Sequence, residues 1–286
     1  MMLSRPESMP APNVRNGASV ATCPLSAAGD DARSHAHLLA LIWTLIRTDF
    51  KVRYHATIGG FVWALLKPVS MFLVLLVVFS FIFAPSDPHY RLNLILGLFL
   101  WEFFAEGTKV GLVSLFAKGY LLTKTRFPRW IVVATSSSNA IITLLVFTIA
   151  ILIYLGWAGR FPSPLRLLLF VVYAIEMWMI VLGFSLSTSV LYPRYRDLNH
   201  LWEAISQAGF FVAPIVFPVQ ILPERLHPYL YLWPPTSVIE FSRRVLIQET
   251  IPTLEANLLL LVATLSILAV GSVVFQRYAA RAAEHV

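Results

Sequence analysis

Six long apolar stretches constrain this chain more than any other feature of its sequence. They cover Val69–Ala84, Leu92–Ala117, Ile131–Trp157, Leu167–Leu191, Leu201–Pro218 and Leu254–Phe275. A helix that crosses a bilayer needs about 20 predominantly apolar residues, and a soluble domain has no use for so many stretches of that length. The hydrophobic fraction of 58% and the mean hydropathy of +0.72 are also outside the range of soluble proteins. The sequence therefore predicts an all-α membrane protein with six transmembrane helices, the first of which can extend back to Phe61.

The basic residues are distributed unevenly between the ends of these stretches. The net charge is +7, which is also compatible with a nucleic-acid-binding protein. The larger group of basic residues, however, flanks alternate ends of the stretches: Arg47, Lys51, Arg53, Lys118, Lys124, Arg126, Arg129, Arg194, Arg196, Arg277 and Arg281. The opposite connections hold the smaller group: Arg91, Arg160, Arg166, Arg225, Arg243 and Arg244. Cytoplasmic loops of membrane proteins carry this excess of Lys and Arg. We therefore expect both termini in the cytoplasm and no nucleic-acid partner.

Two segments before the first span are too polar to cross a membrane. Residues 1–35 are rich in Ala, Pro, Ser and Asn and are expected to form a disordered cytoplasmic tail. Residues 36–57 place apolar side chains at helical spacing and then turn basic, which predicts an amphipathic helix lying in the cytoplasmic interface. The alternative is that this segment simply extends the first span down to the membrane surface.

Two later connections are more apolar than ordinary loops. Residues 118–130 are basic but include Tyr120, Leu121, Leu122 and Phe127, which suggests docking onto a partner. Residues 219–252 should lie outside the cell, yet they carry apolar runs over Leu226–Trp233 and Ser237–Ile247. Neither run can span, so we expect two short re-entrant helices packed against protein. An ordinary folded external cap is the alternative.

Charged residues inside the apolar stretches are candidates for a polar pathway. Glu102 and Glu106 are one helical turn apart, and Glu106 can pair with Lys109. Charges at membrane depth are costly and should face the bundle interior or a wet cavity. A proton relay and a plain internal ion pair both fit this pattern. Glu176 and Glu203 likewise fit either a polar pathway or an isolated helix contact.

The sequence lacks the motifs of a self-sufficient enzyme or pump. It contains no phosphate-binding G-x-x-x-x-G-K-[ST] loop, no H-E-x-x-H and no G-x-S-x-G. Cys23 is the only cysteine, so no intrachain disulfide and no cysteine-based metal site can form. We expect no catalytic residues, no metal site and no cofactor in this chain. If the protein does energised work, another polypeptide supplies the energy.

Seven stretches in a fixed order carry a resemblance to a known family. They are DFKVRYH…GGFVWALLKP (Asp49–Pro68), LWEFFAE (Leu100–Glu106), KTRFPR (Lys124–Arg129), YRDL (Tyr195–Leu198), PIVFPVQILPE (Pro214–Glu224), WPPTSVIEFSR (Trp233–Arg243) and VFQRYAAR (Val274–Arg281). Together they resemble the permease subunit of ABC-2 type exporters for O-antigen, teichoic acid and capsular polysaccharides. The resemblance covers nearly the whole chain from about residue 38.

The resemblance implies a homodimer that forms a channel in the bacterial cytoplasmic membrane and moves a lipid-linked polysaccharide. Two copies of a separate ATPase subunit would bind ATP and Mg²⁺ beneath it. Residues 36–57 would form the interface helix, 118–130 the coupling loop and 219–252 the external gate region. Coupling to the ATPase would fall to Lys118, Tyr120, Lys124, Arg126, Phe127, Arg129, Arg47, Lys51 and Arg53.

The resemblance also implies which residues meet the substrate. Aromatic rings offer amphipathic faces to the C–H faces of sugars. Rings on the implied channel-lining spans are Phe72, Phe79, Phe210, Phe211 and Phe217; a gate or polar pathway would use Tyr195, Arg196, Asp197, Glu102 and Glu106. Two other functions stay open: an ABC-2 permease for a drug or small lipid, and a membrane-embedded glycosyltransferase or acyltransferase.

Overall fold

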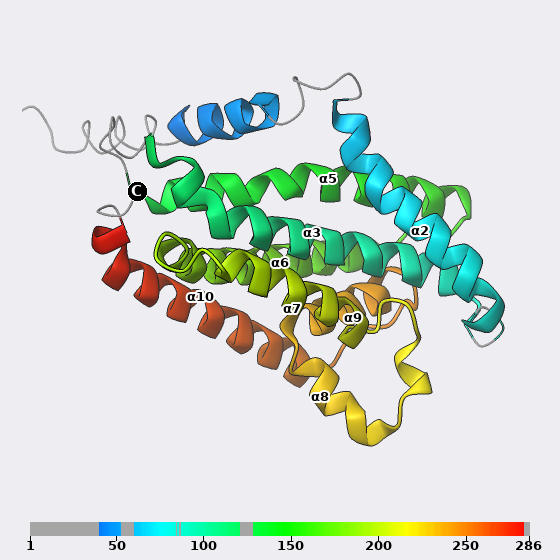
Figure 1. Cartoon of the computed structure of the whole chain (residues 1–286). Helices are drawn as coiled ribbons and strands as arrows, with labels where there is room; N and C mark the ends of the chain where they lie inside the picture. Colours follow the sequence, from blue (N-terminus) through cyan, green and yellow to red (C-terminus); the bar gives the residue numbers. More distant parts are fainter. Residues whose placement is uncertain (1–39, 53–59, 84, 86, 121–127, 283–286) are drawn as a thin grey trace, which may run out of the picture. The chain divides into compact units, whose positions relative to one another are not determined.

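The computed structural model describes residues 40–52, 60–83, 85, 87–120 and 128–282, and every regular element among them is helical. A helix covers residues 40–52. The labelled helices (Figure 1) are α2 (Phe61–Phe83), α3 (Tyr90–Ala117), α5 (Trp130–Trp157), α6 (Pro164–Leu191), α7 (Leu198–Val212), α8 (His227–Tyr231), α9 (Pro234–Leu246) and α10 (Leu254–Ala282). Two short 3₁₀ turns, Val219–Ile221 and Glu224–Leu226, precede α8.

Prolines set several of the helix boundaries. Pro164 and Pro234 occupy the first turns of α6 and α9, where a missing backbone N–H costs nothing. The helix α7 ends at Val212 because Ala213 precedes Pro214, and a residue before proline is driven out of the helical region; Ala213 is extended, with ψ of 134°.

Helix α3 is the centre of the bundle although it carries charged residues. It packs against α2, α5, α6, α7 and α9, and it is lined by fully buried leucines such as Leu94, Leu100 and Leu112. Gly111 lets α6 approach closely, because a Cβ there would lie 2.0 Å from the Ser185 hydroxyl oxygen. The neighbours of α3 therefore shield most of its length from the surroundings.

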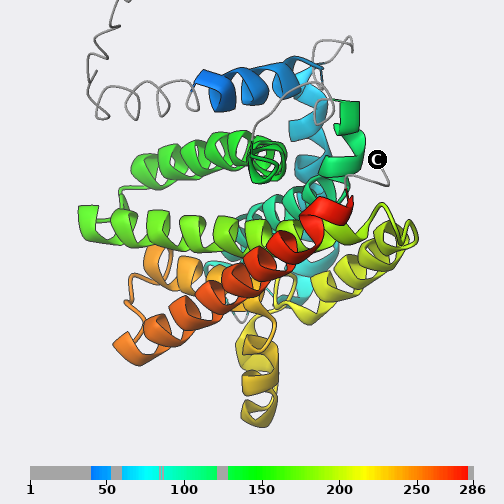
Figure 2. The same ribbon diagram turned by 90° about the vertical axis from the view of Figure 1, so that its left-hand side faces the viewer.

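Helix α10 crosses α6 obliquely, as Figure 2 shows, and the two helices touch through glycines. A Cβ on Gly271 would lie 2.0 Å from the Gly183 carbonyl oxygen, and a Cβ on Gly183 would lie 2.8 Å from the Ile267 carbonyl oxygen. This is the close backbone approach that small residues permit between membrane helices.

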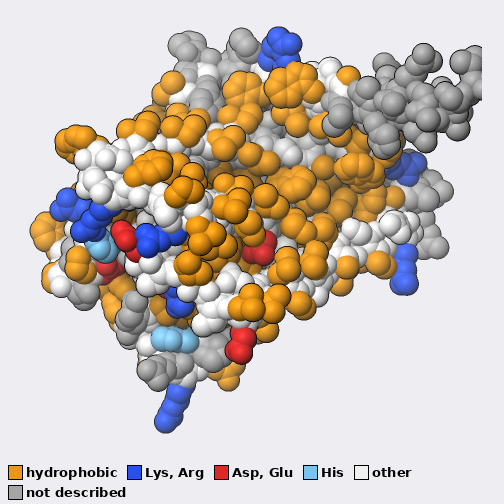
Figure 3. All heavy atoms as spheres, turned by 180° about the vertical axis from the view of Figure 1, so that it is seen from behind, with side chains coloured by type: hydrophobic (Ala, Val, Ile, Leu, Met, Phe, Trp, Pro, Cys, Tyr) orange, Lys and Arg blue, Asp and Glu red, His pale blue; other side chains and the backbone are white. Residues whose placement is uncertain are grey.

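Four helices are long and apolar enough to cross a membrane: α2, α5, α6 and α10. Figure 3 shows a face dominated by apolar side chains; charged side chains and histidines cluster toward one end, an acidic side chain lies near the middle, and further basic side chains lie at the other edges. The predicted count of six is not confirmed. Helix α3 is long enough at 28 residues but carries Arg91, Glu102, Glu106 and Lys109.

The predicted helix over Leu201–Pro218 is wrong in its extent. Helix α7 has 15 residues and stops at Val212. At about 1.5 Å per residue it is about 22 Å long, which is short of the roughly 30 Å hydrocarbon core. Residues 213–218 continue as turns and extended chain.

The non-spanning segments are partly described. The helix over residues 40–52 lies inside the interface helix predicted over 36–57, whereas the predicted tail over 1–35 lies outside the described residues. Of the predicted coupling loop, residues 118–120 and 128–130 are described. Two short helices were predicted within residues 219–252, and the structure has α8 and α9 there, with α9 buried over most of its length; their external, re-entrant position stays a prediction.

Candidate functional site

A groove between α2, α3 and α7 is the candidate functional site, and we call it the polar groove. Its volume is about 660 Å³. Both charged and aromatic residues line it, among them Lys67, Trp101, Glu102, Glu106, Lys109, Trp202, Glu203, Gln207, Phe210 and Phe211. Charged side chains beside apolar spans mark the pathways of ions and polar substrates in membrane proteins.

Two ion pairs cross between helices in the polar groove. The Lys67 ammonium of α2 lies 2.7 Å from the Glu102 carboxylate of α3, and the Lys109 ammonium of α3 lies 2.7 Å from the Glu203 carboxylate of α7. The sequence had suggested a pairing of Lys109 with Glu106 along α3, and the structure pairs it with α7. Lys67, Glu102 and Glu106 also border a second crevice of about 330 Å³ between α2, α3 and α5.

One wall of the polar groove is a cluster of packed rings. Phe104 contacts both Trp202 and Trp233, with ring centroids 6.1 and 6.2 Å apart, and Trp101 contacts Phe210 at 6.0 Å. The Trp202 indole N–H donates to the Thr108 hydroxyl at 3.0 Å. Edge-to-face contacts of this kind hold rings in fixed orientations, so the wall is a rigid aromatic surface.

The five predicted channel phenylalanines are not in one place. Phe210 and Phe211 both line the polar groove; Phe210 is buried and Phe211 is 64% exposed. Phe72 packs against the hydrophobic core, and Phe79 stacks on Phe83 with centroids 6.0 Å apart. Phe217 instead lines a separate cavity of about 390 Å³. Only the two residues on α7 therefore face the polar groove.

A buried arginine holds the chain that follows α7. Arg243 of α9 is 4% exposed, and its guanidinium donates to the carbonyl oxygens of Asn93 at 2.9 Å, Pro214 at 2.6 Å and Ile215 at 3.1 Å. The Glu240 carboxylate lies 3.9 Å away. Burial lowers the pKa of the Arg243 guanidinium, and Glu240 acts in the opposite direction. The arginine thus ties α3, α9 and the turn after α7 together.

Further hydrogen bonds support the same region. The Tyr90 hydroxyl, at the start of α3, donates to the Val216 carbonyl at 2.9 Å. The Asn93 amide donates to the Asp87 carboxylate at 2.7 Å. Together with the bonds of Arg243, these contacts fix the non-helical residues 213–217 against α3.

The predicted coupling residues fall at the end of the bundle where α3 ends and α5 begins. Lys118 pairs with Asp49 and donates to Ser136, and Arg129 donates to the Ala279 carbonyl. Arg47, Lys51 and Tyr120 are exposed. Arg53, Lys124, Arg126 and Phe127 lie outside the described residues.

The predicted gate residues after α6 are on the surface. Tyr195, Arg196 and Asp197 are all exposed. The Arg196 guanidinium lies 5.2 Å from the Phe116 ring centroid, a cation–π contact that links this turn to the end of α3. The structure therefore separates these three residues from the polar groove, which contains the other predicted pathway residues, Glu102 and Glu106.

Sequence reasoning missed several groove residues. Lys67 was expected at the membrane interface, and Trp101 and Trp202 were not predicted to line a groove. Trp101 lies in the same LWEFFAE motif as Glu102, which was the available signal. Among the described residues, no three His, Cys, Asp or Glu side chains are grouped as a metal site requires.

Comparison with known proteins places this arrangement in a family. The O-antigen export system permease protein RfbA of Klebsiella pneumoniae is 25% identical over 248 residues, 87% of this chain and 95% of the relative. The protein of that name from Myxococcus xanthus is 24% identical over 243 residues, covering 82% and 91%. The polysialic acid transport protein KpsM of Escherichia coli is 22% identical over 204 residues, covering 70% and 78%. The model of the ABC-2 type transporter family matches residues 40–247, which is more than half of the sequence, so the chain belongs to the ABC-2 type transporter family.

Proposed function

We propose that this chain is the channel-forming membrane subunit of an ATP-driven exporter of a lipid-linked polysaccharide such as O-antigen, capsule or a teichoic-acid-like glycan. The observation that carries the proposal is the polar groove, which combines a rigid aromatic wall with charged groups. The relatives named for O-antigen export and polysialic acid transport support the choice of substrate class.

The chemistry of the polar groove suits a sugar chain. Hexose rings present C–H faces that pack on aromatic rings, and hydroxyl groups that need hydrogen-bonding partners. Phe211 offers an exposed ring, and Gln207, Glu102 and Lys109 supply polar groups in the same groove. A polymer that slides past such a surface exchanges one set of weak contacts for the next, so no single position holds it.

A second copy of the chain would complete the channel. Among its described side chains, helix α2 has ten large apolar ones on its surface, including Trp63, Val77 and Phe81. Some of this surface faces lipid in our proposal, and some packs on the partner copy beside the polar groove. A homodimer would then enclose one continuous passage.

The proposed topology has six spans and cytoplasmic termini in the bacterial cytoplasmic membrane. Helix α3 crosses with Glu102 and Glu106 partly covered by its neighbours and with Lys109 paired to Glu203 of α7, which reduces the cost of these charges in lipid. Helix α7, with residues 213–218, crosses as a broken segment whose non-helical part is hydrogen-bonded to Arg243 and Tyr90. Helices α8 and α9 form the external gate region.

Energy would come from two copies of a cytoplasmic ATPase that bind ATP and Mg²⁺. The chain itself is not expected to catalyse a reaction. Nucleotide-driven movement of the ATPase would be passed to the permease through residues 118–130 and the interface helix, and it would widen the passage between the two copies.

The proposal is tested by restoring export in a bacterium that lacks its own polysaccharide permease. We expect surface polysaccharide only when this chain is produced together with its ATPase, and accumulation inside the cell when the ATPase carries an inactive nucleotide site. Export that proceeds equally well with the inactive ATPase would contradict the proposal. Restored export of a small lipid or drug, without polysaccharide, would favour the other type of ABC-2 permease.

A further inference from the structure

We propose that the contact between Asp49, Lys118 and Ser136 is a mechanical link. It makes the helix over residues 40–52 move together with the end of α3, from which the predicted coupling loop departs. The inference rests on the proposed function and identifies Asp49 and Lys118 as positioning residues of ATP-driven transport. We call this contact the Lys118 link.

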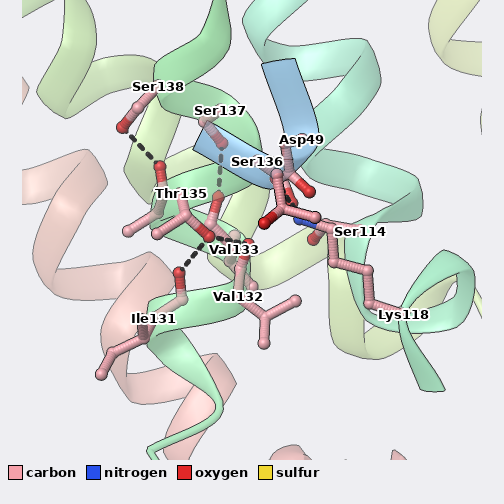
Figure 4. A network of polar contacts seen from close by, with 12 residues as sticks. Asp49, Ser114, Lys118, Ile131, Val132, Val133, Thr135, Ser136, Ser137 and Ser138 are labelled. Atoms are coloured by element: carbon pink, nitrogen blue, oxygen red, sulfur yellow. Dashed lines mark hydrogen bonds and ion pairs between the residues drawn. The ribbon is translucent and has the colours of Figure 1, made fainter. Parts of the chain in front are cut away.

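Three separate elements meet at the Lys118 link. Lys118 is the residue that ends α3, and its ammonium forms an ion pair with Asp49 of the helix over residues 40–52. The same ammonium donates to the hydroxyl of Ser136 in α5 at 2.7 Å. Figure 4 shows Asp49, Ser136 and Lys118 converging from their three helices.

Ser136 differs from its neighbours in a run of hydroxyl residues. Thr135, Ser137 and Ser138 each donate back to a carbonyl four residues earlier in α5, at 2.8, 2.8 and 2.6 Å. Serine and threonine in helices commonly satisfy themselves in this way. Ser136 instead accepts the bond from Lys118, so α5 takes part in the link through one specific hydroxyl.

The Lys118 link is shielded from solvent. The side chains of Lys118 and Asp49 are 16% and 17% exposed, whereas those of the Lys109–Glu203 pair are 51% and 54% exposed. Ion pairs that are shielded from water are weakened less by solvent and salt than exposed ones. Of these two interhelical pairs, the Lys118 link is the one suited to transmit a displacement.

The link rests on a closely packed base. Gly111 lies two turns before Lys118 and leaves room for two serines. A Cβ on Gly111 would lie 2.8 Å from the Ser137 hydroxyl oxygen and 2.0 Å from the Ser185 hydroxyl oxygen. Helices α3, α5 and α6 are therefore in tight contact beside the link. A close-packed interior shifts as a body rather than deforming locally.

The other end of the predicted coupling loop is also tied to a helix. Arg129, just before α5, donates to the carbonyl oxygen of Ala279 near the end of α10. A push on the loop between these two residues would reach the helix over residues 40–52 and α5 through Lys118. It would reach α10 through Arg129. The Lys118 link thus accounts for how a movement of the ATPase could displace the interface helix and the bundle together.

The first experiment compares the complex of permease and ATPase carrying Asp49→Asn, Lys118→Met or both changes. We expect each complex to assemble and hydrolyse ATP, while the polysaccharide exported per ATP falls about fivefold or more. The double variant should be no worse than either single variant, because residues of one linked pair are not additive. Lys118→Arg, which keeps the charge, should restore much of the export. Thr48→Ala, an exposed change on the same helix, is the matched control.

Export per ATP within twofold of the parent in both single variants would overturn the proposal. So would a double variant whose loss equals the product of the two single losses, because the residues would then act separately. Lys118→Arg could also fail to restore export while the ATPase no longer binds. Lys118 would then serve assembly of the complex, and this result would also overturn the proposal.

A second experiment separates this inference from the proposed function, since it needs neither substrate nor ATPase. Spin labels are attached at Trp43→Cys and Trp130→Cys in a Cys23→Ser background, both positions being exposed in the structure. We expect a narrow distance distribution that broadens or shifts with Asp49→Asn and with Lys118→Met. An unchanged distribution in both would overturn the link even where polysaccharide export is established. A broadened one would support it even where the substrate proves different.

Discussion

Gly97 of α3 lies directly against the guanidinium of Arg243: a Cβ built on Gly97 would be 2.4 Å from Arg243 Nη2. The arginine can therefore reach the carbonyl oxygens of Asn93, Pro214 and Ile215 only because residue 97 has no side chain. The turn that interrupts the segment after α7 depends on this pairing of a glycine with a buried cation.

Gly97→Ala should destabilise the protein although alanine favours helices. Alanine gains about 0.5–1 kcal/mol over glycine in a helix interior, but overpacking at a buried contact costs about 1–3 kcal/mol. We expect a lower unfolding temperature for the purified protein in detergent. Gly156→Ala is the control, because its Cβ would meet only Phe161 at an ordinary 3.6 Å. An equal effect of the two changes would contradict the account.

Arg243→Lys should be more damaging than Arg244→Lys. A lysine ammonium cannot reproduce the planar fork that serves three carbonyl oxygens, and each buried acceptor left unpaired costs about 1–3 kcal/mol. The side chain of Arg244 is 39% exposed, and its Nε contacts the Glu240 carboxylate at 3.4 Å. Thermal unfolding of the two variants measures the difference, and a larger loss for Arg244→Lys would refute the role assigned to Arg243.

The two phenylalanines of α7 should separate stability from transport. Phe210 is 8% exposed and packs on Trp101, so Phe210→Ala should cost about 3–5 kcal/mol of folding free energy. Phe211 is largely exposed in the polar groove, so Phe211→Ala should leave the unfolding temperature nearly unchanged while polysaccharide export falls severalfold. Parallel measurement of unfolding and export checks both. If Phe211→Ala exported normally, Phe211 would not be a contact of the substrate.

Gly271→Ala should prevent correct docking of α10 on α6. The new methyl group would meet the backbone carbonyl of Gly183, which cannot move aside as a flexible side chain can. We expect a sharply reduced yield of monodisperse protein by size-exclusion chromatography. Ala263→Val, which enlarges an exposed residue of α10, should behave like the parent. A monodisperse Gly271→Ala protein in normal yield would show that the two helices can separate without loss of the fold.

The lengths of the apolar stretches predicted most of the helices. The one predicted helix that ends early does so because of local backbone chemistry at a proline. Continuous apolar runs located α5 and α6 within a few residues, since such runs have few alternatives to a helix. The start of α10 was located at Leu254, but the helix continues to Ala282, beyond the predicted end at Phe275. The predicted span over Leu201–Pro218 failed because hydropathy does not register how Pro214 ends a helix. That break is held by contacts with distant residues: Arg243 lies 29 residues after Pro214, and Tyr90 lies 126 residues before Val216.

The candidate site was less predictable because its contacts join residues that are distant in sequence. The acidic pair Glu102 and Glu106 stood out in an apolar stretch, and both do line the polar groove. The ion pairs of the groove did not follow from spacing: Lys67 is 35 residues from its partner Glu102, and Lys109 is 94 residues from its partner Glu203. Phe72 and Phe79 contact the core instead of the groove because of the face that α2 turns toward α3. Apolar residues are distributed evenly around α2, so the sequence does not indicate which face that is.

The polar groove should carry the polysaccharide, and a single pair of cysteine variants tests this directly. In a Cys23→Ser background, Gln207→Cys places a thiol in the polar groove and Ile149→Cys places one on the exposed apolar surface of α5. The measurement is the rate of modification by a membrane-impermeant thiol reagent in the complex with its ATPase, with and without polysaccharide in transit. The account predicts that the Gln207→Cys variant reacts much faster than the Ile149→Cys variant and is protected while polysaccharide moves. Equal rates at the two positions, or no protection at position 207, would contradict it.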